Sequence, residues 1–217
     1  MGGAVALLVA GGAVALFTGG DDGGPLIDLP VLGNDDPETP EFAFEVRKVV
    51  PETTSETKAK ELIDTARKVA DQVKVVLDTL YLQGYVEPDT WGDFGSIEGT
   101  FDEAARQQAR ADLDAITLGA AGAETYSFLQ PERGTLVVDV LTDEGDAPVQ
   151  ALAFATFSGL AEGPEGTFTE IQSKASFFLH KVDGEWRIYS YRVKRKDRPA
   201  QAPATATPSS TPTGGAS

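Results

Sequence analysis

The stretch FFLHKVDGEWRIYSYRV, residues 177–193, decides the fold of the C-terminal half of this chain. It holds two runs rich in aromatic and β-branched residues, separated by Asp183-Gly184, a dipeptide that suits the two-residue type I′ turn of a β-hairpin. A two-residue loop fixes the register of both strands. The expected pairs are Val182 with Glu185, Lys181 with Trp186, His180 with Arg187, Leu179 with Ile188, and Phe178 with Tyr189.

This register gives the hairpin two different faces, because successive side chains of a strand point to opposite sides. One face is apolar and is expected in the core: Phe177, Leu179, Trp186 and Ile188, with the stem of Lys181 over the Trp186 indole. The other face mixes aromatic rings with polar tips: Ser176, Phe178, His180, Arg187, Tyr189 and Tyr191. Such a mixture suits a pocket wall or a contact surface, although Tyr and His also often line solvated sheet faces, which is the commoner explanation.

The periodicity of apolar residues assigns the rest of the folded part. Thr53 and Glu56 form a capping box before a long helix whose apolar residues recur every three or four positions until Gly84. A second helix is expected from a capping box at Thr100 and Glu103 to about Thr117. The expected strands are 124–129, 135–141, 149–158, 168–182 and 185–194. The predicted fold class is α+β, with N-terminal helices packed on a curved antiparallel sheet.

Composition divides the chain into four parts. Residues 1–18 include the uncharged run GGAVALLVAGGAVALF and are predicted to be a transmembrane anchor or a signal segment. Residues 19–50 are an acidic linker rich in Gly and Pro, 51–197 form the folded domain, and 198–217 form a disordered Pro/Ala/Thr/Ser tail. Because Asp21 and Asp22 follow the apolar run, we expect a single-pass protein of the bacterial cell membrane with its domain outside the cytoplasm, or a secreted one if the leader is cleaved.

The charge balance bears on the partners of the protein. Acidic residues outnumber basic ones by 34 to 18, which gives a net charge of -16 and makes nucleic acid an unfavourable partner. Basic residues gather after Gly184, where they are either a docking patch for an acidic partner or lipid headgroup, or a solvated strand end. With no cysteine and one histidine, the sequence predicts neither a metal site nor a cofactor.

A long helix, a second helix and a sheet that ends in FFLHKVDGEWRIYSYRV together resemble the nuclear transport factor 2-like superfamily, over about residues 50–196. The resemblance implies a cone-shaped α+β roll with a cavity between helices and sheet. The predicted leader makes the layout similar to the membrane-anchored, mammalian-cell-entry-associated proteins. Enzymes of the superfamily use an Asp or His base with Tyr donors. The residues of those types available here are Asp139, His180, Tyr126, Tyr189 and Tyr191, but none of them lies in a recognisable motif, so no catalytic residue is predicted.

Three functions follow as hypotheses. The first is a noncatalytic binding or assembly module, tethered to the membrane by its N-terminal helix and contacting an envelope protein or a second copy of itself. The alternative is the binding of a small apolar molecule or lipid in the cone. A second alternative is an isomerase or dehydratase of the ketosteroid isomerase type, so whether the protein is an enzyme stays open. The candidate ligand-binding residues are Trp91, Phe178, His180, Tyr189 and Tyr191.

Overall fold

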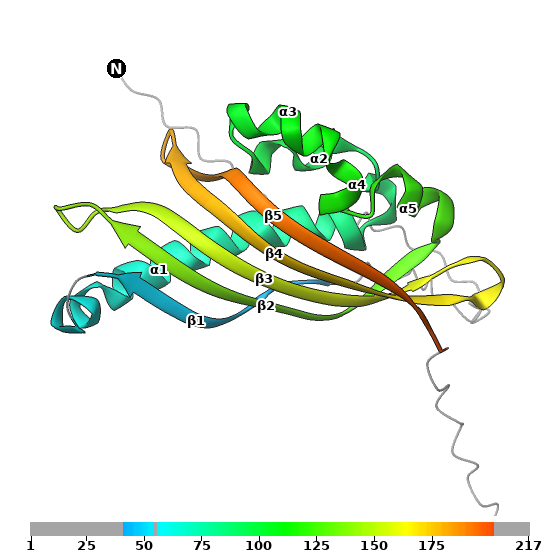
Figure 1. Ribbon diagram of the computed structural model, residues 1–217, viewed down its shortest axis with the longest axis horizontal. Coiled ribbons are helices and arrows are strands. Elements are labelled where there is room, and N and C mark those ends of the chain that lie inside the picture. The colour runs from blue at the N-terminus through cyan, green and yellow to red at the C-terminus, as the bar shows by residue number, and fades with distance from the viewer. Residues whose placement is uncertain (1–40, 54–55, 202–217) are drawn as a thin grey trace, which may run out of the picture. The chain divides into compact units, whose positions relative to one another are not determined.

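The computed structural model describes residues 41–53 and 56–201. The chain divides into two units, Met1–Pro37 and Glu38–Ser217, and all described residues belong to the second. This unit is one five-stranded sheet in the order β1-β2-β3-β4-β5 with helices packed against it (Figure 1). The strands are β1 (Glu45–Glu52), β2 (Phe128–Thr142), β3 (Pro148–Glu162), β4 (Phe168–Val182) and β5 (Glu185–Ala200). The predicted α+β class is confirmed.

The sheet is mixed, whereas the sequence led us to expect an antiparallel one. Strands β2 to β5 pair antiparallel with their neighbours, but β1 runs parallel to β2. The difference arises because all the α-helices of the described chain lie between β1 and β2, and such a long crossover can return the chain in its original direction. Strand β1 also begins at Glu45, inside the range that we assigned to the linker. At the other end, β5 continues to Ala200, three residues beyond the predicted domain.

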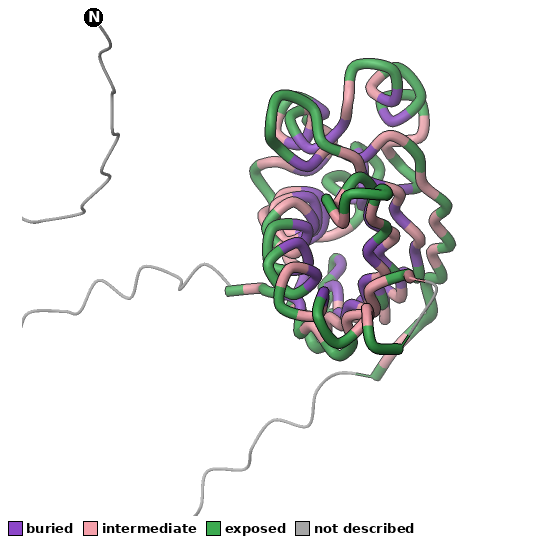
Figure 2. The backbone as a smooth tube through the Cα atoms, turned by 90° about the vertical axis from the view of Figure 1, so that its left-hand side faces the viewer, coloured by how far each residue is buried: buried purple, intermediate pink, exposed green. Residues whose placement is uncertain are grey.

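The long helix α1 (Glu56–Tyr81) crosses the face of the sheet that we call the inner face (Figure 1). Its buried residues follow the predicted spacing: Leu62, Ala66, Val69, Ala70, Val73, Leu77, Leu80 and Tyr81. Buried positions line the side of α1 and of the strands where the two layers meet, while exposed positions lie outside (Figure 2). The opposite face of the sheet, which α1 does not cover, is called the outer face below.

A π-helical turn, η1 (Leu82–Val86), follows α1 and contains Gly84. A Cβ atom at this position would lie 2.6 Å from the Thr117 side-chain methyl group, and the Gly84 carbonyl accepts a hydrogen bond of 3.0 Å from the Leu118 amide. Glycine therefore lets two chain segments pass at a distance that no side chain would permit.

The single second helix predicted for Thr100 to Thr117 is wrong in detail. The chain instead forms several short helices beside β5: η2 (Pro88–Thr90), α2 (Phe94–Ile97), η3 (Glu98–Thr100), α3 (Glu103–Ala111), α4 (Leu113–Ile116) and α5 (Gly119–Thr125). Asp102 caps α3, because its Oδ1 accepts a 2.7 Å hydrogen bond from the Ala105 amide. Helix α5 also includes Glu124 and Thr125, which we had placed at the start of a strand.

The predicted hairpin turn is present, but the register changes six residues after it. Asp183 and Gly184 both have positive φ, as a type I′ turn requires, and the pairs from Val182 with Glu185 to Leu179 with Ile188 are as predicted. A bulge then places Ser190, and not Tyr189, opposite Phe178. One extra residue turns every later side chain of β5 to the opposite face.

No helix among the described residues is long and apolar enough to cross a membrane. The predicted anchor, 1–18, most of the acidic linker, and most of the tail lie outside the described residues.

Candidate functional site

The interior of the roll is filled by aromatic side chains. Tyr81 and Tyr85 stack with their ring centroids 5.1 Å apart, and Phe157 lies within 5.3 Å of both rings. Phe44 meets the edge of Tyr81 at 4.8 Å, and Phe177 lies at 6.3 Å from it. These side chains are at most 2% exposed. The space that a hollow cone would offer to a ligand is therefore occupied by the protein's own core.

The polar groups of this interior are hydroxyls. Tyr81 Oη and Ser173 Oγ are hydrogen-bonded at 3.1 Å. The Tyr85 hydroxyl makes no hydrogen bond among the described residues, but Ser173 lies near enough to oppose slightly the effect of burial on its pKa. Burial raises the pKa of Tyr81 far above its ordinary value and raises the pKa of Tyr85 to about 12. Both phenols therefore stay protonated at neutral pH. The buried residues of the described chain include no carboxylate and no imidazole that could exchange protons with them.

An open groove of about 530 Å³ lies elsewhere, between α1, the segment 96–100 and the tip of the β4–β5 hairpin. Its residues come from three separate parts of the chain: Gln72, Val75, Val76, Thr79, Ser96, Gly99, Thr100, Gly184, Glu185, Trp186 and Arg187. A volume of this size falls within the range of roughly 300–1,000 Å³ that is usual for small-molecule sites.

The walls of the groove are apolar and its rim is polar. Trp186 is 3% exposed, and its indole Nε1 donates a 2.9 Å hydrogen bond to Gln72 Oε1, which fixes the ring against α1. Val75, by contrast, is 64% exposed, more than any other large apolar residue of the described chain. Arg187 forms an ion pair with Glu185 at the opening. The groove thus offers apolar surface to a ligand and charged groups only at its edge.

A second arrangement of functional side chains lies on the outer face of the same hairpin. His180 Nε2 is 3.0 Å from Asp102 Oδ2, close enough for an ion pair when the imidazole is protonated, although this contact does not have the geometry of a hydrogen bond. The Tyr189 ring packs on the imidazole with a centroid separation of 4.9 Å. Because Asp102 also caps α3, the carboxylate is held in place by the backbone as well.

The structure brings together three of the five predicted ligand-binding residues. Phe178, His180 and Tyr189 gather on the outer face, where the Phe178 and Tyr189 rings are 6.3 Å apart. The prediction that Tyr191 shares this face is wrong, since the bulge at Tyr189 turns its side chain inward. None of the five lines the groove.

The other two predicted ligand-binding residues, Tyr191 and Trp91, contact other parts of the fold and do not line the groove. The Tyr191 hydroxyl donates a 2.9 Å hydrogen bond to Asp112 Oδ2, and burial together with this carboxylate raises the pKa of Tyr191. Trp91 is 7% exposed and belongs to the core, and its indole Nε1 has no hydrogen-bond partner among the described residues.

Asp139 and Tyr126, the other residues of the types that enzymes of the superfamily use, do not lie together in one site. Asp139 lies on the outer face of β2, where partial burial and then Glu52 raise its pKa while Lys48 lowers it. Tyr126 packs at the margin of the core, on the segment between α5 and β2. Within 41–53 and 56–201, no three histidine or carboxylate groups are clustered so that they could hold a metal ion.

Sequence reasoning missed the groove because its residues are far apart in the chain. Val75 carried the one available signal: it lies between Lys74 and Val76 on α1 but outside the stripe of buried positions. An apolar residue outside the buried stripe of an amphipathic helix lies in solvent, where it is available to a ligand. Nothing in the sequence shows that the hairpin tip packs beside it.

Comparisons with known proteins identify no family for this chain. No family model and no curated protein matches this sequence. Among solved structures, a type 2 hexachlorocyclohexane dehydrochlorinase is similar at a TM-score of 0.46 and 11% identity, over 67% of this chain and 99% of that one. A scytalone dehydratase candidate from Novosphingobium aromaticivorans is similar at a TM-score of 0.45 and 12% identity, with the same coverage. Similarity at this level carries no conclusion about activity, and the resemblance to membrane-anchored proteins stays a prediction.

Proposed function

We propose that the domain is a noncatalytic binding module that takes a small apolar molecule in the groove between α1 and the β4–β5 hairpin. The observation that carries this proposal is the groove of about 530 Å³ with Val75, Val76 and Trp186 in its walls. Burying apolar ligand surface there would contribute roughly 25 cal/mol for each Å² removed from water. The proposal moves the predicted ligand site from the interior of the cone to its outside.

The packed interior of the roll supports a ligand site in the groove between α1 and the β4–β5 hairpin. Tyr81, Tyr85 and Phe157 fill the space between α1 and the sheet, so a ligand inside the roll would have to displace core side chains. The groove needs no such rearrangement, because its walls are already fixed by the hydrogen bond between Trp186 and Gln72. A preformed site loses less conformational entropy when a ligand binds than a site that must first rearrange.

The kinds of side chain in the groove support a binding role without chemistry. Of the residues around it, only Glu185 and Arg187 ionise, and they form an ion pair with each other at the rim. General acid or base catalysis needs an ionisable group within hydrogen-bond reach of the reacting atom. Away from the rim, the only polar side chains that line the groove are hydroxyls and an amide, which do not ionise at neutral pH.

Binding of N-phenyl-1-naphthylamine, a neutral dye that fluoresces in apolar surroundings, tests the proposal. We expect saturable binding, with energy transfer from Trp186, which lines the groove. The variant Val75→Glu should weaken binding at least tenfold, because a bound dye would desolvate the new carboxylate. The matched control is Val149→Glu, which makes the same change at a residue that is 43% exposed and outside the groove. Equal affinity of the two variants, or dye binding that never saturates, would contradict the proposal.

A second candidate function is acid–base chemistry of the isomerase or dehydratase type, and the contact between His180 and Asp102 favours it. A carboxylate beside an imidazole can orient it and stabilise its charged form during proton transfer. A β,γ-unsaturated ketone is a suitable probe, since moving its double bond into conjugation changes its ultraviolet absorption. Turnover by the native protein that is lost in His180→Gln, but kept in Val75→Glu, would support this candidate. Absence of turnover with the native protein counts against it.

The membrane location is a proposal that rests on the sequence, namely the apolar run of residues 2–17. In its support, this run approaches the roughly 20 residues that a spanning helix needs. Extraction of bacterial membranes with alkaline carbonate should leave the full chain in the pellet. Recovery of the intact chain in the soluble fraction would refute the anchor and leave the groove proposal untouched.

A further inference from the structure

The outer side of β5 carries a row of basic residues without acidic partners. Strand β5 holds six of the 18 Lys and Arg residues of the chain. Arg195 turns to the inner face, where it donates to the Thr117 carbonyl and forms an ion pair with Asp197. The exposed basic residues of the outer face are Lys174, Arg192, Lys194, Lys196 and Arg198; none of these has an ion pair or a side-chain hydrogen bond within the described part of the chain. The row is unusual in a protein with a net charge of -16.

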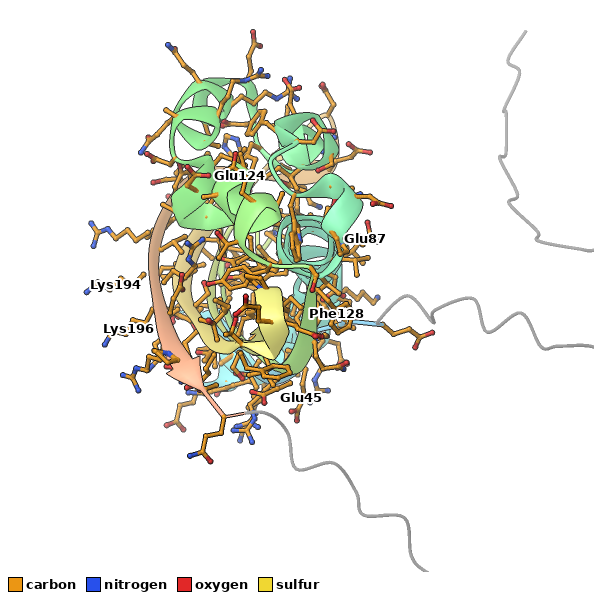
Figure 3. All side chains as sticks on the ribbon, turned by 90° about the vertical axis from the view of Figure 1, so that its right-hand side faces the viewer. Glu45, Glu87, Glu124, Phe128, Lys194 and Lys196 are labelled. Atoms are coloured by element: carbon orange, nitrogen blue, oxygen red, sulfur yellow. The ribbon has the colours of Figure 1, made fainter. Side chains whose placement is uncertain are left out.

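The arrangement of these charges is unfavourable for the protein alone. Lys174 of β4 lies directly opposite Lys194 of β5 in the register, and like charges at such a position destabilise a sheet. Lys194 and Lys196 project from β5 into solvent on the side away from α1 (Figure 3). A bound anion would relieve the repulsion between these side chains.

The charges surround a shallow groove of about 370 Å³ on the outer face. Lys174, Arg192 and Lys194 contribute the cations of its lining, and Thr156 and Ser176 contribute two hydroxyls that can donate to an oxyanion. Phe154, on the neighbouring strand β3, forms the remaining wall and is 42% exposed. No carboxylate lines this groove.

We propose that this outer groove, with the basic row along β5, is a docking surface for an anionic phospholipid membrane. The phosphate of a headgroup would contact Lys174, Arg192 and Lys194, while Phe154 would enter the boundary between headgroups and acyl chains. Arg and Lys bind phosphate oxygens directly, and an aromatic ring is favourable at that boundary.

Charge and shape together favour a membrane over a soluble anion. An isolated phosphate would gain nothing from the exposed Phe154 ring. A lipid surface presents its charge in a plane, and the groove that would meet this plane has no carboxylate in its lining. Charges more than about 10 Å apart in 0.1 M salt are largely screened, so the acidic remainder of the protein opposes the contact only weakly.

A fluorescent label on the outer face can report the contact, because the chain contains no cysteine of its own. The label is attached to the full-length chain at Ser158→Cys on β3, which is separated from β5 by strand β4. The chain is mixed with vesicles of phosphatidylcholine, with or without phosphatidylglycerol. We expect the emission to shift to shorter wavelength only with phosphatidylglycerol present, and the shift to disappear in high salt.

Substitution then assigns the shift to particular residues. The triple variant K174Q/R192Q/K194Q should weaken docking about 100-fold, since each basic residue near an anionic surface contributes a factor of about five. The control R47Q/R67Q/K68Q changes the net charge equally at exposed positions away from the outer groove, and it should dock like the native chain. Phe154→Ser should weaken docking without changing the charge.

Three outcomes would overturn the proposal. The first is an equal shift with neutral vesicles, and the second is an undiminished shift in the triple variant. The third is a salt-sensitive emission without vesicles, which would mean that the acidic segment 19–38 of the same chain occupies the surface. Because the dye-binding groove lies between α1 and the hairpin tip, failure here leaves the proposed function intact.

Discussion

The two stacked tyrosines of the interior provide a test of whether the roll is packed or able to hold a ligand. Tyr81 and Tyr85 are both fully buried, and their rings are nearly parallel at an angle of 14°. They differ in their hydrogen bonds: the Tyr81 hydroxyl is bonded to Ser173 at 3.1 Å, whereas the Tyr85 hydroxyl makes no hydrogen bond among the described residues, although Ser173 lies near enough to lower its pKa. Replacing each by phenylalanine keeps the ring in place and removes the hydroxyl alone.

The expected effects on the free energy of unfolding have opposite signs. Tyr81→Phe removes one hydrogen bond and leaves the buried Ser173 hydroxyl without its partner, which should cost about 2 kcal/mol. Tyr85→Phe removes a buried polar group that makes no bond, which should stabilise the protein by about 1 kcal/mol. The two variants should therefore differ by about 3 kcal/mol, or on the order of 6–12 °C in melting temperature for a domain of this size.

Urea unfolding followed by circular dichroism measures both values. A control is Ser173→Ala, which should recover part of the loss when added to Tyr81→Phe, because it removes the buried hydroxyl that was left without a partner. If Tyr85→Phe destabilises the protein as much as Tyr81→Phe does, the Tyr85 hydroxyl has a partner such as a bound water or ligand. The interior would then be a polar cavity, and the site would have to be placed there.

Three further predictions concern the fold and its pH dependence. Gly84→Ala should destabilise by about 1–3 kcal/mol in urea unfolding, because its Cβ would lie 2.6 Å from the Thr117 methyl, whereas an unchanged midpoint would show that the two segments can separate. Asp102→Ala should lower stability by about 1 kcal/mol through loss of the α3 cap, and Asp102→Asn should restore most of it. The pKa of Asp139 is raised in the folded state, so the folded state holds this proton more tightly than the unfolded state does. The ionised carboxylate therefore destabilises the fold at pH values above the folded-state pKa. Below the unfolded-state pKa the group is protonated in both states and has no effect on stability. Asp139→Asn should thus raise the melting temperature at neutral pH and lose this advantage in acid, and a gain that does not depend on pH would disprove the assignment.

Patterns of neighbouring residues predicted helices and turns correctly where the pattern was strong. The stripe of α1 and the turn at Asp183-Gly184 depend on residues that are neighbours in the chain, and the structure confirms both. The bulge at Tyr189 was not predictable, because no residue of the hairpin marks it; it follows Ile188, whose backbone forms a bridge with Phe101. The predicted face of Tyr191 was wrong for that reason.

The candidate sites were harder to predict than the elements. Trp91 was assigned to a ligand wall because large aromatic residues are uncommon in glycine-rich loops, but the side chain belongs to the core. The contact of His180 with Asp102 joins residues 78 positions apart, and no spacing rule relates them. The basic row of β5, in contrast, was visible in the sequence, since alternate residues of one strand share a face.

The sequence by itself determined the fold class, the long helix, the final hairpin and the basic character of β5, because periodicity and turn chemistry act between residues that are close in the chain. Only the tertiary structure decided that the roll is filled, that β1 pairs parallel with β2, and that the open groove lies beside Trp186. These features depend on the volumes and register of segments that are far apart in the chain, by 114 residues for Gln72 and Trp186, and that meet only when the whole core packs.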